Sequence, residues 1–252
     1  MAKTSIAGYD ADHVTIRGKD LVADLMGKVT FTELMLLQLT GKTPTKAQVT
    51  ILDAVLVTIM EHGLVPSAIV TRLTHYGAPE SVQGAIVAGL LGVGDRFAGT
   101  ASECAQLLET IVSAPTSDRA NVAIELVKDY RVRKRPIPGF GHPIHRDVDP
   151  RSKRLIDIVK AAGAQGNKGE HVAALEALEQ AVLSVVGKRI VTNVSAAIAV
   201  ALCEAGVPSK VSRGIVLTAR CAGLVGHLQE ESESPAGEAM WNAITDTVRY
   251  EP

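Results

Sequence analysis

Aromatic residues and cysteines are scarce in this chain of 252 residues, and it lacks long apolar runs. The three cysteines, Cys104, Cys203 and Cys221, show no Cys-x-x-Cys spacing, which favours buried thiols in a reducing compartment over disulfides or zinc ligands. No apolar run approaches the roughly 18 residues that a membrane span needs. The segment from Met1 to His13 lacks the basic start and apolar stretch of a signal peptide. We therefore expect a cytoplasmic protein with no membrane partner.

A strong net charge is also absent. The formal charge of -1 argues against a general nucleic-acid binder, although it permits a local basic patch for a small anion. Hydrophobic residues make up 46% of the chain, which is enough to build a core over this length. We expect a globular protein whose partner is a small molecule.

Alternating strand patterns are rare, whereas apolar residues recur at spacings of three and four. This periodicity predicts an all-α fold. Thr30 with Glu33, and Thr45 with Gln48, have the spacing of capping boxes and mark two helix starts. Gly41 and Gly63 are expected to end these helices. Further helices are predicted over residues 67–75, 81–93, 102–112, 120–132, 152–162, 172–186, 196–204 and 209–230.

The most irregular long loop, residues 133–149, contains the most informative motif of the chain. Long loops inside compact helical proteins are more often functional than idle. Gly139 and Gly141 flank Phe140 and are expected to let the main chain approach a ligand. His142 follows, and its ring exchanges protons near neutral pH, which suits a catalytic base.

Asp149 and Pro150 predict the start of the next helix. They read as an N-cap followed by proline at the first helical position, which places Arg151 in the first turn, facing the loop. His142 and His145 are three residues apart in this loop, but proline lies between them and no third ligand stands out. We therefore expect no metal.

Several further motifs together carry a resemblance to a known family. The chain resembles the citrate synthase superfamily, and within it the short citryl-CoA lyases and the lyase module of ATP-citrate lyase. The resemblance runs through Ile16-Arg17-Gly18-Lys19-Asp20-Leu21, Glu61-His62-Gly63, Gly94-Asp95-Arg96-Phe97-Ala98-Gly99, Gly139-Phe140-Gly141-His142, Asn193-Val194 and the segment from Arg220 to His227.

This resemblance implies a citrate synthase-like fold, in which a large helical domain and a smaller helical insertion enclose the active site. By the resemblance, residues 1–100 form the first part of the large domain. Residues 101–195 form the small domain, and residues 196–252 return to the large one. Members are dimers, so a homodimer is expected.

The resemblance also implies an activity. It is the reversible carbon-carbon cleavage of a citryl-CoA-type thioester into acetyl-CoA and oxaloacetate or a related 2-oxoacid, with coenzyme A as part of the substrate. His142 would act on the hydroxyl proton, and Arg151, Arg220 and His62 would bind di- and tricarboxylate groups. The residues expected to meet coenzyme A are Arg133, Lys134, Arg135, Gly139, Phe140 and Gly141. The alternative for the three basic residues is a solvated helix end with cations near its C-terminus.

Two positions depart from the superfamily. Phe97 stands where synthases have a histidine that steadies the enolate, although the lyase module has a similar Gly-Asp-Arg-Phe, and we place Phe97 with the substrate-binding residues. Ser195 stands where the superfamily has a catalytic aspartate, and a hydroxyl is too weak a base at pH 7 to deprotonate an acyl-CoA methyl group. Ser195 is also a candidate N-cap of the helix expected from residue 196. Asp95 is the candidate replacement base, with pairing to Arg96 as its alternative.

These departures leave other functions open. A condensation of another acyl-CoA with a 2-oxoacid, in the manner of a citrate synthase, is the enzymatic alternative. The alternative from a different class is a non-catalytic protein that binds CoA esters or carboxylates.

Overall fold

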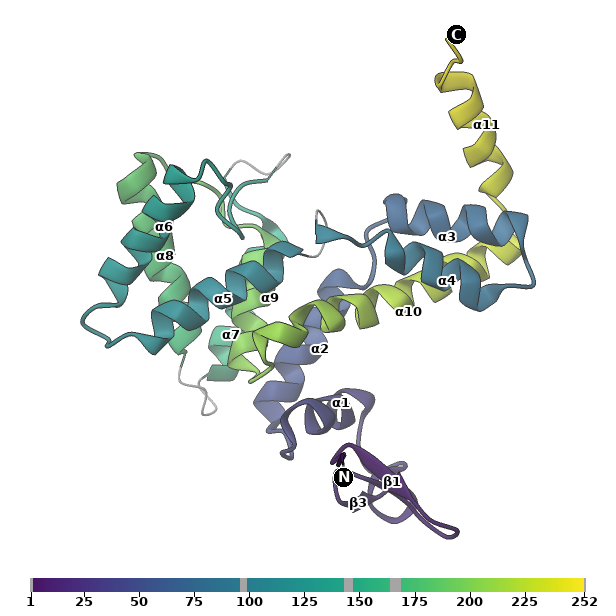
Figure 1. The fold of residues 1–252 in the computed structure, drawn as a ribbon, viewed down its shortest axis with the longest axis horizontal. Coiled ribbons are helices and arrows are strands. Elements are labelled where there is room, and N and C mark those ends of the chain that lie inside the picture. Colours follow the sequence, from purple (N-terminus) through teal and green to yellow (C-terminus); the bar gives the residue numbers. More distant parts are fainter. Residues whose placement is uncertain (1, 96–98, 143–146, 164–168, 252) are drawn as a thin grey trace. The chain divides into compact units, whose positions relative to one another are not determined.

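The computed structural model describes residues 2–95, 99–142, 147–163 and 169–251. It divides into two compact units (Figure 1). The first unit comprises Met1–Val55 and Glu103–Ser212, and the second comprises Leu56–Ser102 and Arg213–Pro252. The domain boundaries implied by the family resemblance rest on a different criterion and stay a prediction.

The expected all-α class is confirmed, with one small sheet that the sequence pattern did not predict. Strands β1 (Ala7–Tyr9), β2 (Val14–Ile16) and β3 (Lys19–Asp20) form an antiparallel sheet in which Ala7 pairs with Ile16. Each strand has three residues or fewer, so no alternation of polar and apolar residues is long enough to be recognised. A single turn of π-helix, Leu21–Leu25, follows the sheet.

The first unit is otherwise helical. Its core is helix α9, in which residues 196–202 are at most 3% exposed, so this helix is buried on all sides. Helix α9 packs against α7 and α8, and α8 also packs against α6. The helices of this unit are α1 (Phe31–Thr40), the first part of α2 (Lys46–Met60), α5 (Thr100–Ser113), α6 (Arg119–Val132), α7 (Pro150–Gly163), α8 (Glu170–Val186) and α9 (Val194–Glu204).

Both predicted capping boxes are confirmed. The Glu33 backbone N–H donates to the Thr30 hydroxyl at 3.1 Å, and the Thr30 N–H donates to the Glu33 carboxylate at 2.6 Å. Thr45 and Gln48 exchange the same pair of bonds at 3.3 and 2.9 Å. Gly41 ends α1 with a left-handed φ of 71°. Helix α2 ends earlier than expected, at Met60, three residues before Gly63.

The second unit contains α3 (Pro66–Gly77), α4 (Val82–Leu91), α10 (Ser212–Glu233) and α11 (Gly237–Thr247), and its α10 begins within the predicted range 209–230 after a short 3-10 turn, Ser209–Val211. Helix α3 packs against both α4 and α11. Helix α11 was not predicted. It rests on Tyr76, whose ring lies 6.3 Å from that of Trp241, and a Cβ at Gly237 would approach the Tyr76 Cβ to 2.6 Å.

No helix among the described residues is both long enough and apolar enough to cross a membrane.

Two glycines on α10 provide a matched test of this packing. A Cβ at Gly223 would lie 2.2 Å from the Met60 carbonyl oxygen, whereas a Cβ at Gly214 would meet nothing within 4 Å. We expect Gly223→Ala to lower the free energy of unfolding by about 1–3 kcal/mol because the backbone must shift. Gly214→Ala should leave it unchanged or raise it by up to about 1 kcal/mol. Urea denaturation of both variants is the measurement, and equal effects would contradict the close packing of α10 on the end of α2.

Candidate functional site

The glycine-rich loop is attached to the segment that precedes α9. Phe140 and Thr192 form an antiparallel bridge. The Gly141 N–H donates to the Val191 carbonyl at 2.7 Å, and the Asn193 N–H donates to the Gly139 carbonyl at 2.9 Å. These bonds hold His142, the next residue of the loop, next to the start of α9.

The backbone of this loop favours glycine at two positions, and at one of them close packing also excludes a side chain. Both have left-handed φ angles, 85° at Gly139 and 89° at Gly141. A Cβ at Gly139 would lie 2.7 Å from the Ala196 Cβ and 2.9 Å from the Cys104 Sγ. Gly139 is therefore required for close packing inside the protein. The sequence led us to expect an approach to a ligand, and the close neighbours observed at Gly139 are the protein's own atoms.

His142 and Arg151 are brought together. The Arg151 Nη2 lies 3.4 Å from the His142 Nε2. Because a guanidinium only donates hydrogen bonds, Nε2 acts as the acceptor in this contact, and a neutral ring then carries its proton on Nδ1. The geometry leaves a lone pair of His142 facing a permanent positive charge.

Asp149 holds Arg151 in this position. The carboxylate is fully buried and accepts the Arg151 Nε at 3.1 Å, its Nη2 at 3.0 Å and its backbone N–H at 3.0 Å. Burial opposes ionisation of Asp149, but its hydrogen bonds to Arg151 and the charge of that side chain outweigh burial, so the pKa of Asp149 is lowered. The predicted helix start is confirmed, since α7 begins at Pro150 with Asp149 capping its first turn.

The same carboxylate reaches the start of α9. The Val194 N–H donates to Asp149 Oδ2 at 3.1 Å. Asn193 caps α9 by accepting the Ser195 N–H at 3.0 Å, and its amide nitrogen donates to the Gly141 carbonyl at 2.9 Å. The expectation that Ser195 caps this helix was wrong, because the Asn193 side chain takes that place and Ser195 lies in the first turn.

The basic residues ahead of the loop are exposed, and two of them have partners within the protein. Arg133 pairs with Asp129 at 2.9 Å, and Arg135 approaches Glu103 at 3.4 Å. Lys134 has a left-handed φ of 54° and makes no side-chain contact among the described residues. Of the three basic residues expected to meet coenzyme A, Lys134 is the one whose charge is not already paired in the described structure.

The second unit holds the remaining predicted residues. His62 is exposed, and Arg220 is largely buried. The Arg220 Nη1 has no hydrogen-bond partner within the described part of the chain and lies 4.0 Å from the Glu61 carboxylate. Burial opposes ionisation of Glu61, but hydrogen bonds from the His62 backbone and from the His227 ring lower its pKa.

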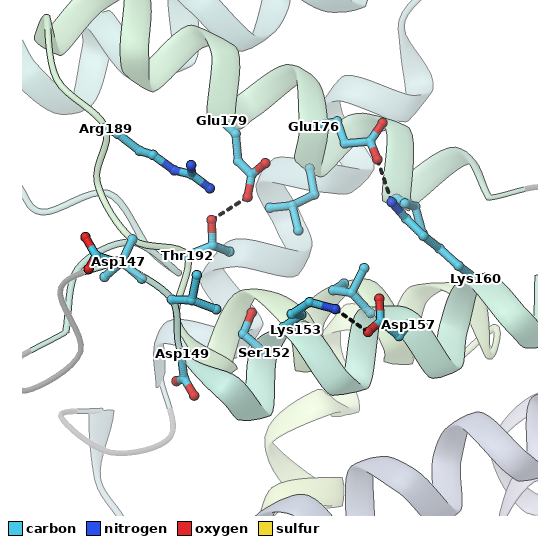
Figure 2. Close-up of a pocket in the computed structure, with 15 residues that line it drawn as sticks. Asp147, Asp149, Ser152, Lys153, Asp157, Lys160, Glu176, Glu179, Arg189 and Thr192 are labelled. Carbon is cyan, nitrogen blue, oxygen red and sulfur yellow. Dashed lines mark hydrogen bonds and ion pairs between the residues drawn. The ribbon is translucent and has the colours of Figure 1, made fainter.

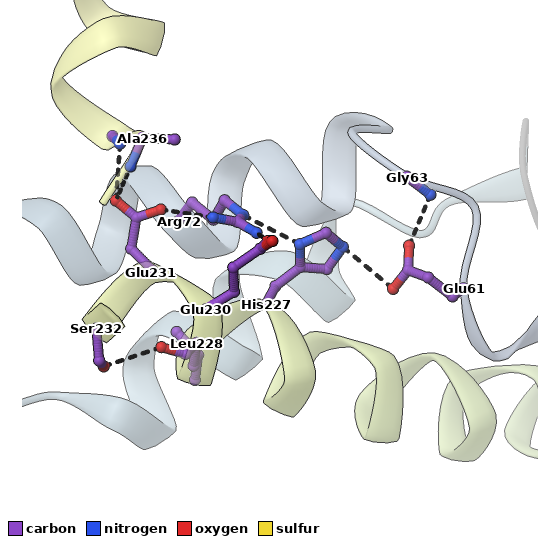
Figure 3. A network of polar contacts seen from close by, with 10 residues as sticks. Glu61, Gly63, Arg72, His227, Leu228, Glu230, Glu231, Ser232 and Ala236 are labelled. Carbon is purple, nitrogen blue, oxygen red and sulfur yellow. Dashed lines mark hydrogen bonds and ion pairs between the residues drawn. The ribbon is translucent and has the colours of Figure 1, made fainter. Parts of the chain in front are cut away.

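A partly buried polar network continues from the exposed Glu61 (Figure 3). The His227 Nε2 lies 3.1 Å from the Glu61 carboxylate, and the Arg72 Nε donates to the His227 Nδ1 at 3.0 Å. Arg72 is 3% exposed and also pairs with Glu230 and Glu231. Because Arg72 donates to Nδ1, the neutral His227 ring carries its proton on Nε2, directed at Glu61. The network therefore fixes the carboxylate that faces Arg220.

Asp95, Phe97 and Ser195 are the residues that the sequence places where the enolate would be handled. Asp95 is exposed and pairs with Arg213 at 2.7 Å. Phe97, the other residue of that motif, lies outside the described residues, as does Arg96. Ser195 is half-buried.

Four residues of these arrangements were not recognised as functional candidates from the sequence. Asn193 was noted only as part of a motif, and Asp149 only as a helix cap. Glu61 was likewise noted only as part of a motif. Arg72 was not considered, although an arginine within an apolar helix pattern is a signal of a buried ion pair.

A buried ion pair provides a test of the Asp149 link. We expect Asp149→Asn to lower the free energy of unfolding by about 1.5–3 kcal/mol at pH 7, because Arg151 loses a charged acceptor. The lowered pKa of Asp149 means that its stabilisation is present above the ordinary aspartate pKa of about 3.9 and is lost as the pH falls through the folded-state value. Urea denaturation of both proteins should show a difference that narrows below about pH 4. A difference that stays constant with pH would contradict the assignment.

Comparisons with known proteins agree with this architecture. A family model described as "Citrate synthase, C-terminal domain" matches residues 2–240. The solved structure of citryl-CoA lyase from Hydrogenobacter thermophilus is 31% identical, with a TM-score of 0.88, and the match covers 100% of this chain and 95% of that one. ATP citrate lyase from Methanothrix soehngenii, solved with citrate and coenzyme A, shares the fold at 19% identity and a TM-score of 0.78, over 100% of this chain and 42% of that one.

Curated relatives are more distant in sequence and longer. A citrate synthase of Heyndrickxia coagulans is 26% identical over 200 residues, which are 79% of this chain and 52% of the relative. A putative citrate synthase 2 of Mycobacterium tuberculosis is 29% identical over 196 residues, 75% of this chain and 49% of the relative. The chain spans about half the length of the curated relatives it matches.

Proposed function

This chain belongs to the citrate synthase family, and we propose that it catalyses the reversible cleavage of a citryl-CoA-type thioester into acetyl-CoA and oxaloacetate or a related 2-oxoacid. The observation that carries the proposal is the contact between His142 and Arg151, with Arg151 held by the buried Asp149. The match to a citryl-CoA lyase along the whole chain favours cleavage over condensation.

His142 is the group proposed to act on the substrate hydroxyl. Its Nε2, once it has exchanged its contact with Arg151 for the substrate hydroxyl, would take the hydroxyl proton while the carbon-carbon bond breaks, so that the oxygen becomes the new carbonyl of the oxoacid. The bonding electrons move to the acetyl carbon, which leaves as the thioester enolate and gains a proton to become acetyl-CoA.

Arg151 is proposed to bind a substrate carboxylate. Its Nε and Nη2 are committed to Asp149, whereas its Nη1 has no hydrogen bond among the described residues. The side chain is 31% exposed, so the remaining donors are accessible. In the second unit, the unpartnered Arg220 Nη1 and the exposed His62 are proposed to do the same for another carboxylate.

Coenzyme A is proposed as the carrier of the acyl group. Lys134 is the best placed of the three basic residues for a phosphate, and Arg133 and Arg135 would have to exchange their present partners for it. Phe140 and Gly141, which are half-buried, are the proposed contact for the rest of the cofactor, whereas Gly139 is buried against the protein itself. The family relatives solved with coenzyme A support this choice of ligand.

The residues proposed to handle the enolate are less suited to proton transfer than His142 is. Ser195 would orient the acyl group by a hydrogen bond, and the proton would come from water or from Asp95. Asp95 would first have to leave Arg213. Phe97 stays a predicted substrate contact.

The serine at position 195 also favours two alternatives. A different acyl-CoA or 2-oxoacid would suit a site without the family aspartate, in either the cleavage or the condensation direction. A protein that binds CoA esters without turnover would also retain the arginines and His142.

A homodimer is the proposed assembly. Helix α4 exposes Val82, Val87 and Leu91, by 48%, 53% and 80%. Val87 and Leu91 are four residues apart and share one face of the helix, and this exposed apolar pair supports contact with a second copy, as the family resemblance implies. The expected cytoplasmic location stays a prediction.

The proposed reaction has a direct test. Incubation with citryl-CoA should release acetyl-CoA and oxaloacetate, and His142→Ala should reduce the rate by about 10²–10⁴-fold because the hydroxyl proton loses its acceptor. His13→Ala, an exposed histidine in the loop between β1 and β2, is the matched control and should retain the wild-type rate. If neither product appears above the level of the His142→Ala variant, the proposed reaction is excluded.

Position 195 allows a second test. Ser195→Asp restores the carboxylate of the family, and the first turn of α9 tolerates a negative charge there. We expect it to raise citryl-CoA turnover by at least about tenfold, within the range of general acid-base catalysis. Ser195→Asn, whose side chain is similar in shape to aspartate but uncharged, should not raise the turnover. A loss of turnover in the folded Asp variant would show that the site is adapted to the serine and to a different acyl group.

A further inference from the structure

A pocket in the first unit lies apart from the proposed reaction (Figure 2). It has a volume of about 350 Å³ and is enclosed by α7, α8 and the segment that leads into Thr192. Among the described residues that line it, His142, Arg151 and Ser195 are absent. The pocket is therefore a place for a ligand beside the proposed site, with which it shares Asp149.

Two of its three cations are already neutralised. Lys153 pairs with Asp157 at 2.8 Å, one turn along α7, and Lys160 pairs with Glu176 of α8 at 2.9 Å. The carboxylate next to each lysine offsets its charge and so weakens its attraction for a multiply charged anion. The lining as a whole carries more carboxylates than cations, which also disfavours citrate or a phosphate.

Arg189 is the third cation, and it is different. It is exposed and makes no hydrogen bond or ion pair with any other described residue. Figure 2 shows its side chain extending from the backbone before Thr192 toward the pocket. A guanidinium in this position suits one carboxylate group.

Acceptors for a positive group lie on the same lining. One oxygen of Glu179 accepts the Thr192 hydroxyl, and the other has no hydrogen bond within the described structure. Asp147 is exposed and lacks a partner among the described residues. An ammonium group has three donors to offer such oxygens.

The rest of the wall is apolar. Val172, Leu175 and Val191 line the pocket and are themselves at most 8% exposed, so they form a firm surface. Ile156 of α7 joins them. A short branched aliphatic group placed there would remove apolar surface from water on both sides.

We propose that this pocket binds a free α-amino acid with a branched aliphatic side chain, namely leucine, isoleucine or valine. Its carboxylate contacts Arg189, its ammonium contacts Glu179, and its side chain packs against Leu175, Val172 and Val191. One free cation, one free carboxylate oxygen and an apolar wall match the three parts of such a molecule.

The pocket is also connected to the loop that carries His142. The Thr192 side chain lines the pocket, while its backbone bridges to Phe140. Asp149 lines the pocket as well, and it holds Arg151. A bound amino acid is therefore expected to change the turnover of the proposed reaction. This consequence rests on the proposed function, whereas the binding itself does not.

Calorimetric titration of the full chain tests the binding without any assay of activity. Leucine, isoleucine or valine should bind with a dissociation constant below about 1 mM. Arg189→Gln and Glu179→Gln should each weaken it by at least about tenfold. Lys188→Gln removes the neighbouring charge, which does not line the pocket, and should bind as the wild type does. Arg189 is exposed, so its variant is expected to fold, and an unchanged thermal transition checks this.

Three results would overturn the proposal. The first is no binding of any of the three amino acids at about ten times the expected dissociation constant. The second is equal binding by folded Arg189→Gln. The third is binding of citrate, phosphate or coenzyme A that competes with leucine and depends on Arg189, which would assign the pocket to anionic ligands. Binding of leucine to a protein that fails to cleave citryl-CoA would support the pocket and contradict only the proposed reaction.

Discussion

The buried carboxylate of Asp149 is the interaction on which the first unit's candidate site depends. It accepts three hydrogen bonds from Arg151 and one from the Val194 backbone, and so it joins the beginnings of α7 and α9. A buried charge is costly unless its lone pairs are satisfied, and here they are. Because Arg151 in turn contacts His142, a single ionised group links the positive charge, the proposed base and two helix starts.

The backbone completes this arrangement from the other side. Asn193 donates to the Gly141 carbonyl and caps α9 with the same side chain. Gly139 allows the loop to pack on Cys104 and Ala196. The residues proposed for the hydroxyl side of the reaction, His142 and Arg151, thus contact one another, whereas those proposed for the enolate side are Ser195 and an exposed Asp95. This asymmetry supports the family and the ligand class more strongly than a particular reaction.

Most helices could be predicted because the signals of a helix, its cap and its apolar periodicity, involve residues close together in the sequence. Capping boxes at Thr30 and Thr45 span four residues, and the apolar periodicity is continuous. The three strands were not predicted because they are too short to show a period. Helix α11 was not predicted because its contacts with Tyr76 come from a distant helix. The family and the citrate synthase-like fold, expected from the motifs, are confirmed.

The site was predicted less completely, for a physical reason. Arg151 was expected to face the loop that carries His142, because the helix start at Asp149 and Pro150 places it in the first turn. The bonds from Asp149 to Val194 and from Arg72 to His227 link positions 45 and 155 residues apart, and no local pattern encodes such pairs. The cap assigned to Ser195 was wrong because the helix begins earlier, at Val194, and Asn193 caps it by accepting the Ser195 N–H.

The claim that Asp149 and Arg151 form a preassembled carboxylate site is most directly tested by calorimetric titration with oxaloacetate. The account predicts that the protein binds oxaloacetate and that Arg151→Gln weakens binding by about ten- to 150-fold, the loss expected for a charged hydrogen bond of about 1.5–3 kcal/mol. Equal affinity of the folded variant and the wild type would contradict it.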